Sequence, residues 1–419
     1  MNTPTPRAAQ PLPPARRDSR RAARRSAAAG LAGALTCLGL AAGVPQVASS
    51  ATTPTQLEAG RAPGDRRWLA IGDSISSGFG ITSISRRASL WDQQCYRADG
   101  VEPVDTAGGR AWPVVAYGLL RERGRFVSQQ FSACSGAITD DWIKQLAEAS
   151  VRAGVTIRSE VTSDATPERT SPLVRELVAA AAAGRRWDLV TVTMGANNVE
   201  FGDFVRRCLN VADPQGQDLT WSSESWDSCG QAQLEIQRQI DVLVGRVPVD
   251  ATHRLGQGRV PLWAANPAGG AVEPLYSVIA RFVNPGGRVL VMGYPQLVEE
   301  PARTVLAGRW KEHPGLLTRA GSCEGIAFAD IPRVRAVVSY LNAALAEAVR
   351  KAGAANPTVS FEFLDPNPTA LETPQGRHSL CTRLPWTNGM QPGLGGALHP
   401  NAAGHKAMGE VVARQLSAG

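Results

Sequence analysis

The sequence has few of the residues that build metal centres. It contains no Cys-x-x-Cys pair, and its five histidines are scattered along 419 residues. Zinc sites draw on clustered cysteine and histidine ligands, so we expect no metal ion and no other cofactor. Internal repeats and low-complexity stalks are also missing, which argues against a structural or cell-wall attachment role.

Most of the net positive charge lies in the first 51 residues. The formal net charge is +7, but residues 1–51 hold seven Arg and one Asp, so only +1 belongs to the rest. The sequence therefore gives no reason to expect a nucleic-acid partner. With 43% hydrophobic residues, the remainder is long enough and apolar enough to bury a full core.

The first 51 residues have the pattern of an export signal peptide. An Arg-rich head from Arg16 to Arg25 precedes an Ala/Gly/Leu run, and Pro45 and small residues follow. We expect this segment to be cleaved from a secreted chain, with a polar lead-in over 52–66. An uncleaved anchor helix is the alternative, although the apolar run is short and Ala/Gly-rich for a membrane span.

Six of the seven cysteines lie beyond this leader, at Cys95, Cys134, Cys208, Cys229, Cys323 and Cys381. An even number of cysteines in an exported chain predicts disulfides. Six cysteines permit 15 pairings, and spacing alone does not choose among them. Proximity in the sequence favours the pairs 95–134, 208–229 and 323–381.

Short apolar runs alternate with helical segments over residues 67–419. The patterns predict strands over 68–71, 125–131, 187–194, 287–293 and 359–364. They predict helices over 112–120, 139–150, 171–183, 231–244 and 331–353, and a closing helix after residue 401. This alternation predicts an α/β fold with a five-stranded, mostly parallel sheet covered on both faces.

Residues suited to chemistry follow three of these strands. Ser74, Gly136 and Asn197 each come just after a strand, and His399 lies in a loop before the last helix. Because the carboxyl ends of parallel strands share one sheet edge, we expect these residues to meet there. Plainer roles exist for each: Ser74 could cap a helix, and Gly136 and Asn197 could serve turns. His405 is expected to be exposed on the last helix.

Together these residues fit serine-based ester hydrolysis. Such a reaction needs a nucleophile, a base that takes its proton, and donors aimed at the oxyanion. Ser74 would be the nucleophile and His399 the base. The main-chain N–H groups of Ser74 and Gly136 and the side-chain amide of Asn197 would be the donors. The Gly-x-Ser-x-Gly elbow of α/β-hydrolases is absent.

The chain resembles the SGNH or GDSL-type hydrolases, in particular their secreted actinobacterial esterase and lipase branch. Four blocks carry the resemblance: Ile71-Gly-Asp-Ser74, Ala133-Cys-Ser-Gly136, Gly195-Ala-Asn-Asn198 and His399-Pro-Asn-Ala-Ala-Gly-His405. Supporting stretches include Val291-Met-Gly-Tyr-Pro295 and His378-Ser-Leu-Cys381. The resemblance implies a flavodoxin-like three-layer sandwich, ester hydrolysis without a metal, and three disulfides in the sequential pairing.

Two positions depart from the family pattern. Many members carry Asp three residues before the catalytic His, where this chain has Gly396. Some members of the branch orient the imidazole with a main-chain carbonyl instead, so we predict that the Gly396 carbonyl does so in a Ser–His dyad. Asn198 stands where Asp commonly follows the donor asparagine; it keeps the hydrogen-bonding shape, and we expect it to be tolerated.

The expected substrate is a lipid ester, with acetylated carbohydrate as the alternative. Extra length lies near 150–170 and 210–280, and Trp221, Trp226 and Trp263 there could line an acyl or glycan pocket or pack in the core. A degenerate protein that binds lipid or glycan without hydrolysis is a further alternative. We expect a monomer that makes transient contact with lipid surfaces.

Overall fold

The structure is a computed structural model. It describes residues 66–81, 110–126, 128–143, 146, 183–209, 229–249, 253–265, 273–299, 330–367, 372–373, 376–380, 382, 384–389, 396 and 398–418. The expected export signal, nearly all of the lead-in, the 150–170 segment and most of the helix expected over 171–183 lie outside these residues. Those expectations stay predictions.

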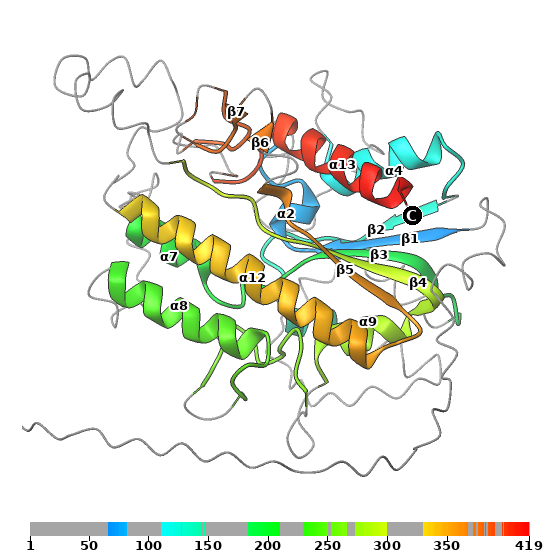
Figure 1. The fold of residues 1–419 in the computed structure, drawn as a ribbon, viewed down its shortest axis with the longest axis horizontal. Helices are drawn as coiled ribbons and strands as arrows, with labels where there is room; N and C mark the ends of the chain where they lie inside the picture. Colours follow the sequence, from blue (N-terminus) through cyan, green and yellow to red (C-terminus); the bar gives the residue numbers. More distant parts are fainter. Residues whose placement is uncertain are drawn as a thin grey trace, which may run out of the picture. The chain divides into compact units, whose positions relative to one another are not determined.

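Five strands form one parallel sheet (Figure 1). They are β1 (Arg67–Gly72), β2 (Ser128–Phe131), β3 (Trp187–Thr193), β4 (Val283–Met292) and β5 (Ser360–Leu364). Their spatial order is β2-β1-β3-β4-β5, and every neighbouring pair is parallel. This is the flavodoxin-like order, in which ligands bind beyond the carboxyl ends of the strands where the order reverses. The predicted fold class is confirmed.

The start of β4 differs from the sequence-based expectation. The strand begins at Val283 rather than Gly287 and runs through Pro285 with a register shift against β3 between Trp187 and Leu189. The Asp188 carboxylate next to this irregularity accepts a hydrogen bond from Asn284 Nδ2 at 2.8 Å. Residues 284–287 have no ladder partner on β3, because Trp187 pairs with Val283 and Leu189 with Arg288, so the Pro-Gly-Gly segment forms a bulge within the strand.

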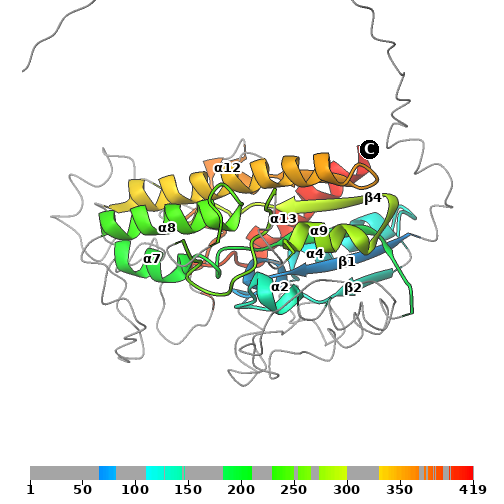
Figure 2. The same ribbon diagram turned by 90° about the horizontal axis from the view of Figure 1, so that it is seen from below.

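Helices cover both faces of the sheet (Figures 1 and 2). One face carries α4 (Trp112–Arg121) and α13 (Ala402–Ser417), which pack against each other. The other carries α7 (Phe201–Cys208), α8 (Cys229–Leu243), α9 (Leu275–Arg281) and α12 (Ile331–Ala355). On α12 the buried positions recur at helical spacing, as Val334, Val338, Leu341, Leu345 and Ala348. These layers bury a large core that includes residues of β1, β3, β4 and β5, and Phe131 of β2 lies in a smaller cluster with Ala70 and Val114.

Two short helices were not expected from the sequence. Helix α7 has eight residues and four of them are Asp or Arg or Gly, so its apolar stripe is brief. Helix α9 has seven residues and follows Pro274. Both are too short for a sustained period of 3.6, and packing against α8, α12 and β4 stabilises them instead. The short pairs β6 (Glu372–Thr373) and β7 (Gly376–Arg377) were missed for the same reason.

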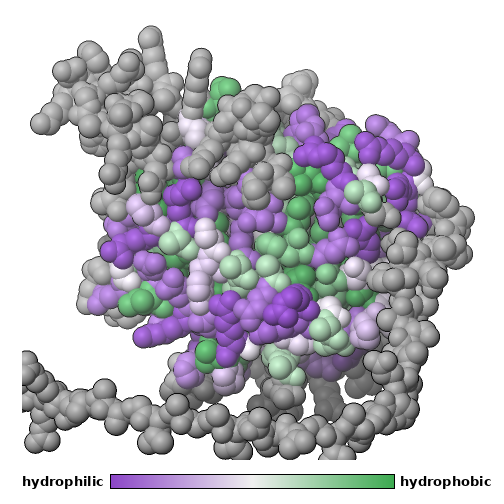
Figure 3. All heavy atoms as spheres, viewed as in Figure 1, coloured by the Kyte–Doolittle hydropathy of each residue, from purple (hydrophilic) through white to green (hydrophobic). Residues whose placement is uncertain are grey.

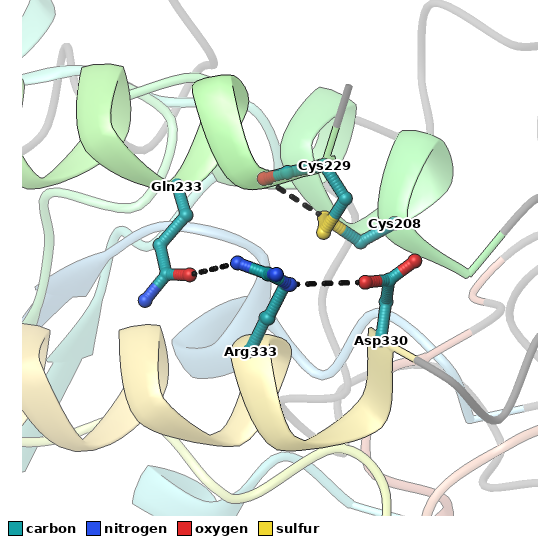
Figure 4. Close-up of a disulfide and its surroundings, with 5 residues drawn as sticks. All are labelled: Cys208, Cys229, Gln233, Asp330 and Arg333. Atoms are coloured by element: carbon teal, nitrogen blue, oxygen red, sulfur yellow. Dashed lines mark hydrogen bonds and ion pairs between the residues drawn. A yellow bond between two sulfur atoms is a disulfide. The ribbon is translucent and has the colours of Figure 1, made fainter.

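One predicted disulfide is present among the described residues. Cys208 and Cys229 are bonded and join the end of α7 to the start of α8 (Figure 4). Beside them Arg333 of α12 bonds Gln233 and pairs with Asp330. In the chain-entropy model, closing a loop of this size contributes roughly 3 kcal/mol. Cys134 is also disulfide-bonded, but residues 95, 323 and 381 lie outside the described residues, so the other two pairings stay predictions.

Apolar residues also reach the surface in places. On the face seen in Figure 3 they gather in a patch bordered by hydrophilic residues. Among large apolar side chains of the described residues, Leu234, Val249 and Leu384 are exposed. Within the part of the chain that the structure describes, no helix combines the length and apolar character that crossing a membrane requires.

Two glycines in the α4–α13 pair give a matched test of this packing. A Cβ at Gly409 on α13 would lie 2.6 Å from Val115 Cβ, whereas one at Gly118 on α4 would meet nothing within 4 Å. We expect Gly409→Ala to lower the free energy of unfolding by about 1–3 kcal/mol through overpacking. Gly118→Ala should raise it by about 0.5–1 kcal/mol through its helix preference. Urea unfolding measures both; equal effects would contradict close packing at Gly409.

Candidate active site

Ser74 is the first residue of a short helix at the end of β1. The strand ends at Gly72, and α2 (Ser74–Ser77) starts at once. Asp73 caps this helix, because its side chain accepts a hydrogen bond from the Ile75 N–H at 3.0 Å. The capping role that Ser74 could have taken therefore belongs to Asp73. Ser74 Oγ instead lies 2.8 Å from His399 Nε2.

His399 reaches Ser74 from a loop 325 residues further along the chain. The following α13 is capped by Asn401, whose side chain accepts from the Ala403 and Gly404 N–H groups. The Phe79 ring meets the imidazole edge to face, with ring centroids 4.9 Å apart. Both Ser74 and His399 are half-buried. The site thus has a nucleophile and a base in contact at a partly solvent-exposed sheet edge.

The Gly396 carbonyl binds the main chain of the histidine loop. It accepts the His399 N–H at 3.0 Å and the Asn388 side-chain amide at 3.3 Å. The orientation of the imidazole by this carbonyl stays a prediction.

Gly136 and Asn197 come from the loops after β2 and β3. Gly136 is exposed with φ +76°, a conformation that favours glycine, and a Cβ there would meet nothing within 4 Å. Asn197 Nδ2 donates to the Ala137 carbonyl at 3.0 Å, which joins the two loops. An amide group has two N–H donors, so one remains for a ligand. Within the described residues, the main-chain N–H groups of Ser74 and Gly136 have no protein acceptor.

Asn198 is fully buried and joins three loops. Its Oδ1 accepts from the Thr139 N–H, while its Nδ2 donates to Thr139 Oγ1 at 2.8 Å and to the Gln257 carbonyl at 3.0 Å. A carboxylate at this position could not donate to that carbonyl. Asn198, which stands where the family commonly has Asp, therefore makes a hydrogen bond that Asp could not make. The sequence alone showed only that Asn has the same shape as Asp.

A buried tyrosine connects the nucleophile turn to the asparagine loop. Tyr294, just after β4, donates its hydroxyl to Asp73 Oδ2 at 2.5 Å and accepts from the Ala196 N–H at 2.9 Å. Its main chain is held by Asn342 of α12, which accepts from Tyr294 N–H and donates to its carbonyl. This hydroxyl fixes the residue before Asn197 relative to the residue before Ser74. Tyr294 lay in a quoted motif, but its role required the tertiary contacts.

Burial controls the titration of several groups near the site. It raises the pKa of Asp73 to about 7, although the hydrogen bonds from Tyr294 and Ile75 oppose this. It also raises the pKa of Tyr294 well above its ordinary value, helped by the Asp73 charge. Burial lowers the pKa of His405 to about 3, so this imidazole is neutral.

His405 corrects one expectation about the last helix. It is fully buried rather than exposed. It shares a buried helix face with Met408, Gly409 and Val412, at spacings of three, four and seven residues. That periodicity was visible in the sequence. Trp263 is also buried, at 7% exposure, in the core, whereas Trp221 and Trp226 lie outside the described residues.

No group of three or more His, Cys, Asp or Glu side chains within the described ranges could hold a metal ion. Independence from metals and other cofactors stays a prediction, since parts of the chain lie outside those ranges.

The model of the GDSL-like lipase/acylhydrolase family matches residues 70–407. The chain therefore belongs to this family and is a carboxylic ester hydrolase. A comparison with curated protein sequences gives no match.

Solved structures similar to this chain include lipases and esterases. An extracellular lipase from Streptomyces rimosus is 19% identical, with 84% of this chain and 99% of that chain covered and a TM-score of 0.46. Phospholipase A1 from Streptomyces albidoflavus NA297 is 16% identical, with the same coverages and a TM-score of 0.45. An acetylxylan esterase from Geobacillus stearothermophilus is 13% identical, with 85% and 96% covered and a TM-score of 0.30.

The buried carboxyl of Asp73 gives a pH-dependent stability. Its pKa is about 7 in the folded chain against 3.8 for the free side chain. Between those values the folded state holds a proton that the unfolded state has lost, so this contribution to stability falls as pH rises from about 4 to about 7. At 1.36 kcal/mol per pKa unit, the loss is up to about 4 kcal/mol.

Asp73→Asn isolates this effect, because its amide oxygen can still cap α2. Urea unfolding at several pH values should show the variant gaining stability relative to the unaltered chain as pH rises from 4 to 7, with no further gain above pH 8. A difference in free energy of unfolding that is independent of pH would contradict the raised pKa of Asp73.

Proposed function

We propose that the protein is a secreted serine hydrolase that cleaves lipid esters through a Ser74–His399 dyad. The observation that carries the proposal is the 2.8 Å separation of Ser74 Oγ and His399 Nε2. This is a hydrogen-bond distance suited to proton transfer. Ser74 is kept available for chemistry because Asp73 caps the helix.

The reaction proceeds in two halves. His399 Nε2 takes the proton of Ser74 Oγ as the oxygen attacks the ester carbonyl carbon and forms a tetrahedral intermediate. When this intermediate collapses, the bond to the alcohol oxygen breaks, and the imidazolium gives its proton to the departing alcohol. A water molecule then attacks the acyl-Ser74 ester with His399 again as base, which releases the carboxylic acid and restores the serine.

Three donors would stabilise the oxyanion of each intermediate. The main-chain N–H groups of Ser74 and Gly136 lack acceptors within the described residues, and Asn197 has a second amide hydrogen beyond the one that Ala137 accepts. Losing one such donor typically costs about 10²–10³ in rate. The Gly396 carbonyl completes the proposal as the group that orients His399.

The acyl group is the least constrained part of the proposal. A lipid ester is our first choice, and an acetyl group on carbohydrate is the alternative. We also propose a monomer that touches lipid surfaces transiently. A degenerate binding protein would need neither the close Ser74–His399 pair nor donors left for a ligand, so hydrolysis is favoured.

Hydrolysis of p-nitrophenyl esters of increasing acyl length tests the proposal with a matched pair of serine variants. Ser74→Ala removes the nucleophile and should lower kcat by at least about 10³-fold. Ser76→Ala removes a neighbouring hydroxyl, buried and unpartnered within the described residues, and should leave kcat within about twofold. Full hydrolysis by Ser74→Ala would exclude Ser74 as the nucleophile.

The dependence on acyl length separates the substrate classes. A rate that rises toward long acyl chains supports lipid esters, whereas activity confined to acetate moves the assignment to carbohydrate deacetylation. Failure of a fluorophosphonate probe to label Ser74 would favour the binding protein over both.

Export is the second part of the proposal. It rests on the Arg-rich head and apolar run within residues 1–51 and on the Cys208–Cys229 disulfide, a bond that persists in oxidising compartments. Expression of the full chain in an actinobacterial host should yield a mature protein in the medium that has lost the Arg-rich head. Intact protein retained in the membrane fraction would favour the anchor helix instead.

A further inference from the structure

Three segments of the chain contact one another next to His399. Residues 78–80 follow the helix that begins with Ser74, residues 387–388 belong to the tail of the chain, and residues 396 and 398–400 surround the histidine. Thr387 and Pro400 form an antiparallel bridge. Asn388 N–H donates to the His399 carbonyl at 2.9 Å, and Leu398 N–H donates to the Asn388 carbonyl at 3.0 Å. The main chain of Asn388 is thus hydrogen-bonded to the histidine itself and to the residue before it.

The Asn388 side chain adds a second set of bonds from the same residue. Its Nδ2 donates to the Gly80 carbonyl at 2.5 Å and to the Gly396 carbonyl at 3.3 Å. Because both partners are carbonyl oxygens, the amide nitrogen must be the atom that faces them. Asn388 therefore joins the segment that follows the nucleophile to the segment that precedes the base.

Two glycines let these segments approach closely. Gly80 and Gly396 have φ values of +106° and +90°. A Cβ at Gly396 would lie 2.4 Å from Gly80 Cα, and a Cβ at Gly80 would lie 2.8 Å from His399 Cβ. A side chain at either position would push the nucleophile segment and the histidine segment apart. A carboxylate side chain at 396 could not be added without this displacement.

We propose that Asn388 is the positioning residue for His399, holding the imidazole against Ser74 by donating its amide to the Gly80 and Gly396 carbonyls. The proposal rests on the proposed Ser74–His399 chemistry. The loop that carries His399 sets where its imidazole lies. Asn388 supplies the cross-link that fixes this loop, and the Gly80–Gly396 contact sets its distance from the nucleophile.

Asn388→Ala and Asn388→Asp test the amide without removing the main-chain bonds of residue 388. The Asp variant keeps the shape but has no N–H, and its carboxylate would face two carbonyl oxygens. Since His399 acts as base in both halves of the reaction, both variants should lower kcat by about 10- to 100-fold, as expected for a misplaced catalytic group. KM should stay within about twofold, and the rate of fluorophosphonate labelling at Ser74 should fall with kcat.

A control variant separates positioning from loss of stability. Leu345→Ala creates a cavity in the buried face of α12, far along the chain from the histidine loop. It should lower the thermal midpoint at least as much as the Asn388 variants, yet keep kcat within about twofold. Kinetics are measured well below all midpoints, so that every variant is folded.

Gly396→Ala and Gly396→Asp test the same proposal without altering Asn388. They replace the Asn388 variants if those fail to fold. Both should lower kcat with KM little changed, because the new Cβ displaces the Gly80 segment. Wild-type kcat in the folded Asn388 variants, or in Gly396→Ala, would overturn the proposal. A rise of kcat in Gly396→Asp would do the same.

The failure of the underlying chemistry has a different signature. If hydrolysis by the unaltered chain persists in Ser74→Ala, the proposed function fails whatever Asn388 does. If hydrolysis requires Ser74 but kcat is insensitive to Asn388, only the positioning role is overturned.

Discussion

The buried hydroxyl of Tyr294 is the contact on which the geometry of the sheet edge depends. It donates to Asp73 and accepts from Ala196, so one oxygen links residues just beyond β1 and β3 from a position just beyond β4. A parallel sheet brings strand ends to the same edge but does not fix the turns that follow them. A low-dielectric surrounding strengthens these hydrogen bonds and makes their loss costly. The turns before Ser74 and Asn197 are therefore set relative to each other.

Polar side chains with main-chain partners extend this arrangement across the site. Asn198 ties the loop after β2 to the loop after β3 and to Gln257, and Asp140 accepts from the Arg259 and Val260 N–H groups. Near the histidine, Asn388 joins two segments in the same way, by donating to the Gly80 and Gly396 carbonyls. Amides recur in these positions because they both donate and accept. The loops of the site are thus held by neutral amides together with the buried carboxyl groups of Asp73 and Asp140.

The parallel sheet and its approximate strands could be predicted from the sequence, whereas the flavodoxin-like arrangement was implied only by the family resemblance. Apolar runs such as Trp187–Thr193 are short, β-branched and bounded by turns, and their alternation with amphipathic helices leaves few alternatives to a parallel sheet. Features decided by packing were missed. Helices α7 and α9 are too short to show a period, and the Pro-Gly-Gly segment of β4 is a bulge whose Gly286 N–H bonds the Thr358 carbonyl before β5.

The sequence by itself identified Ser74, Gly136, Asn197 and His399 as the candidate site residues and showed that the first three follow strands. It could do so because each of these residues lies in a local pattern of small residues and turns. Only the tertiary structure decided that Tyr294 links Asp73 to Ala196 and that Asn388 faces the Gly80 and Gly396 carbonyls. These outcomes depend on contacts between segments up to about three hundred residues apart. Local propensity and periodicity carry no information about such contacts, since they arise only when the folded sheet brings distant loops to one edge.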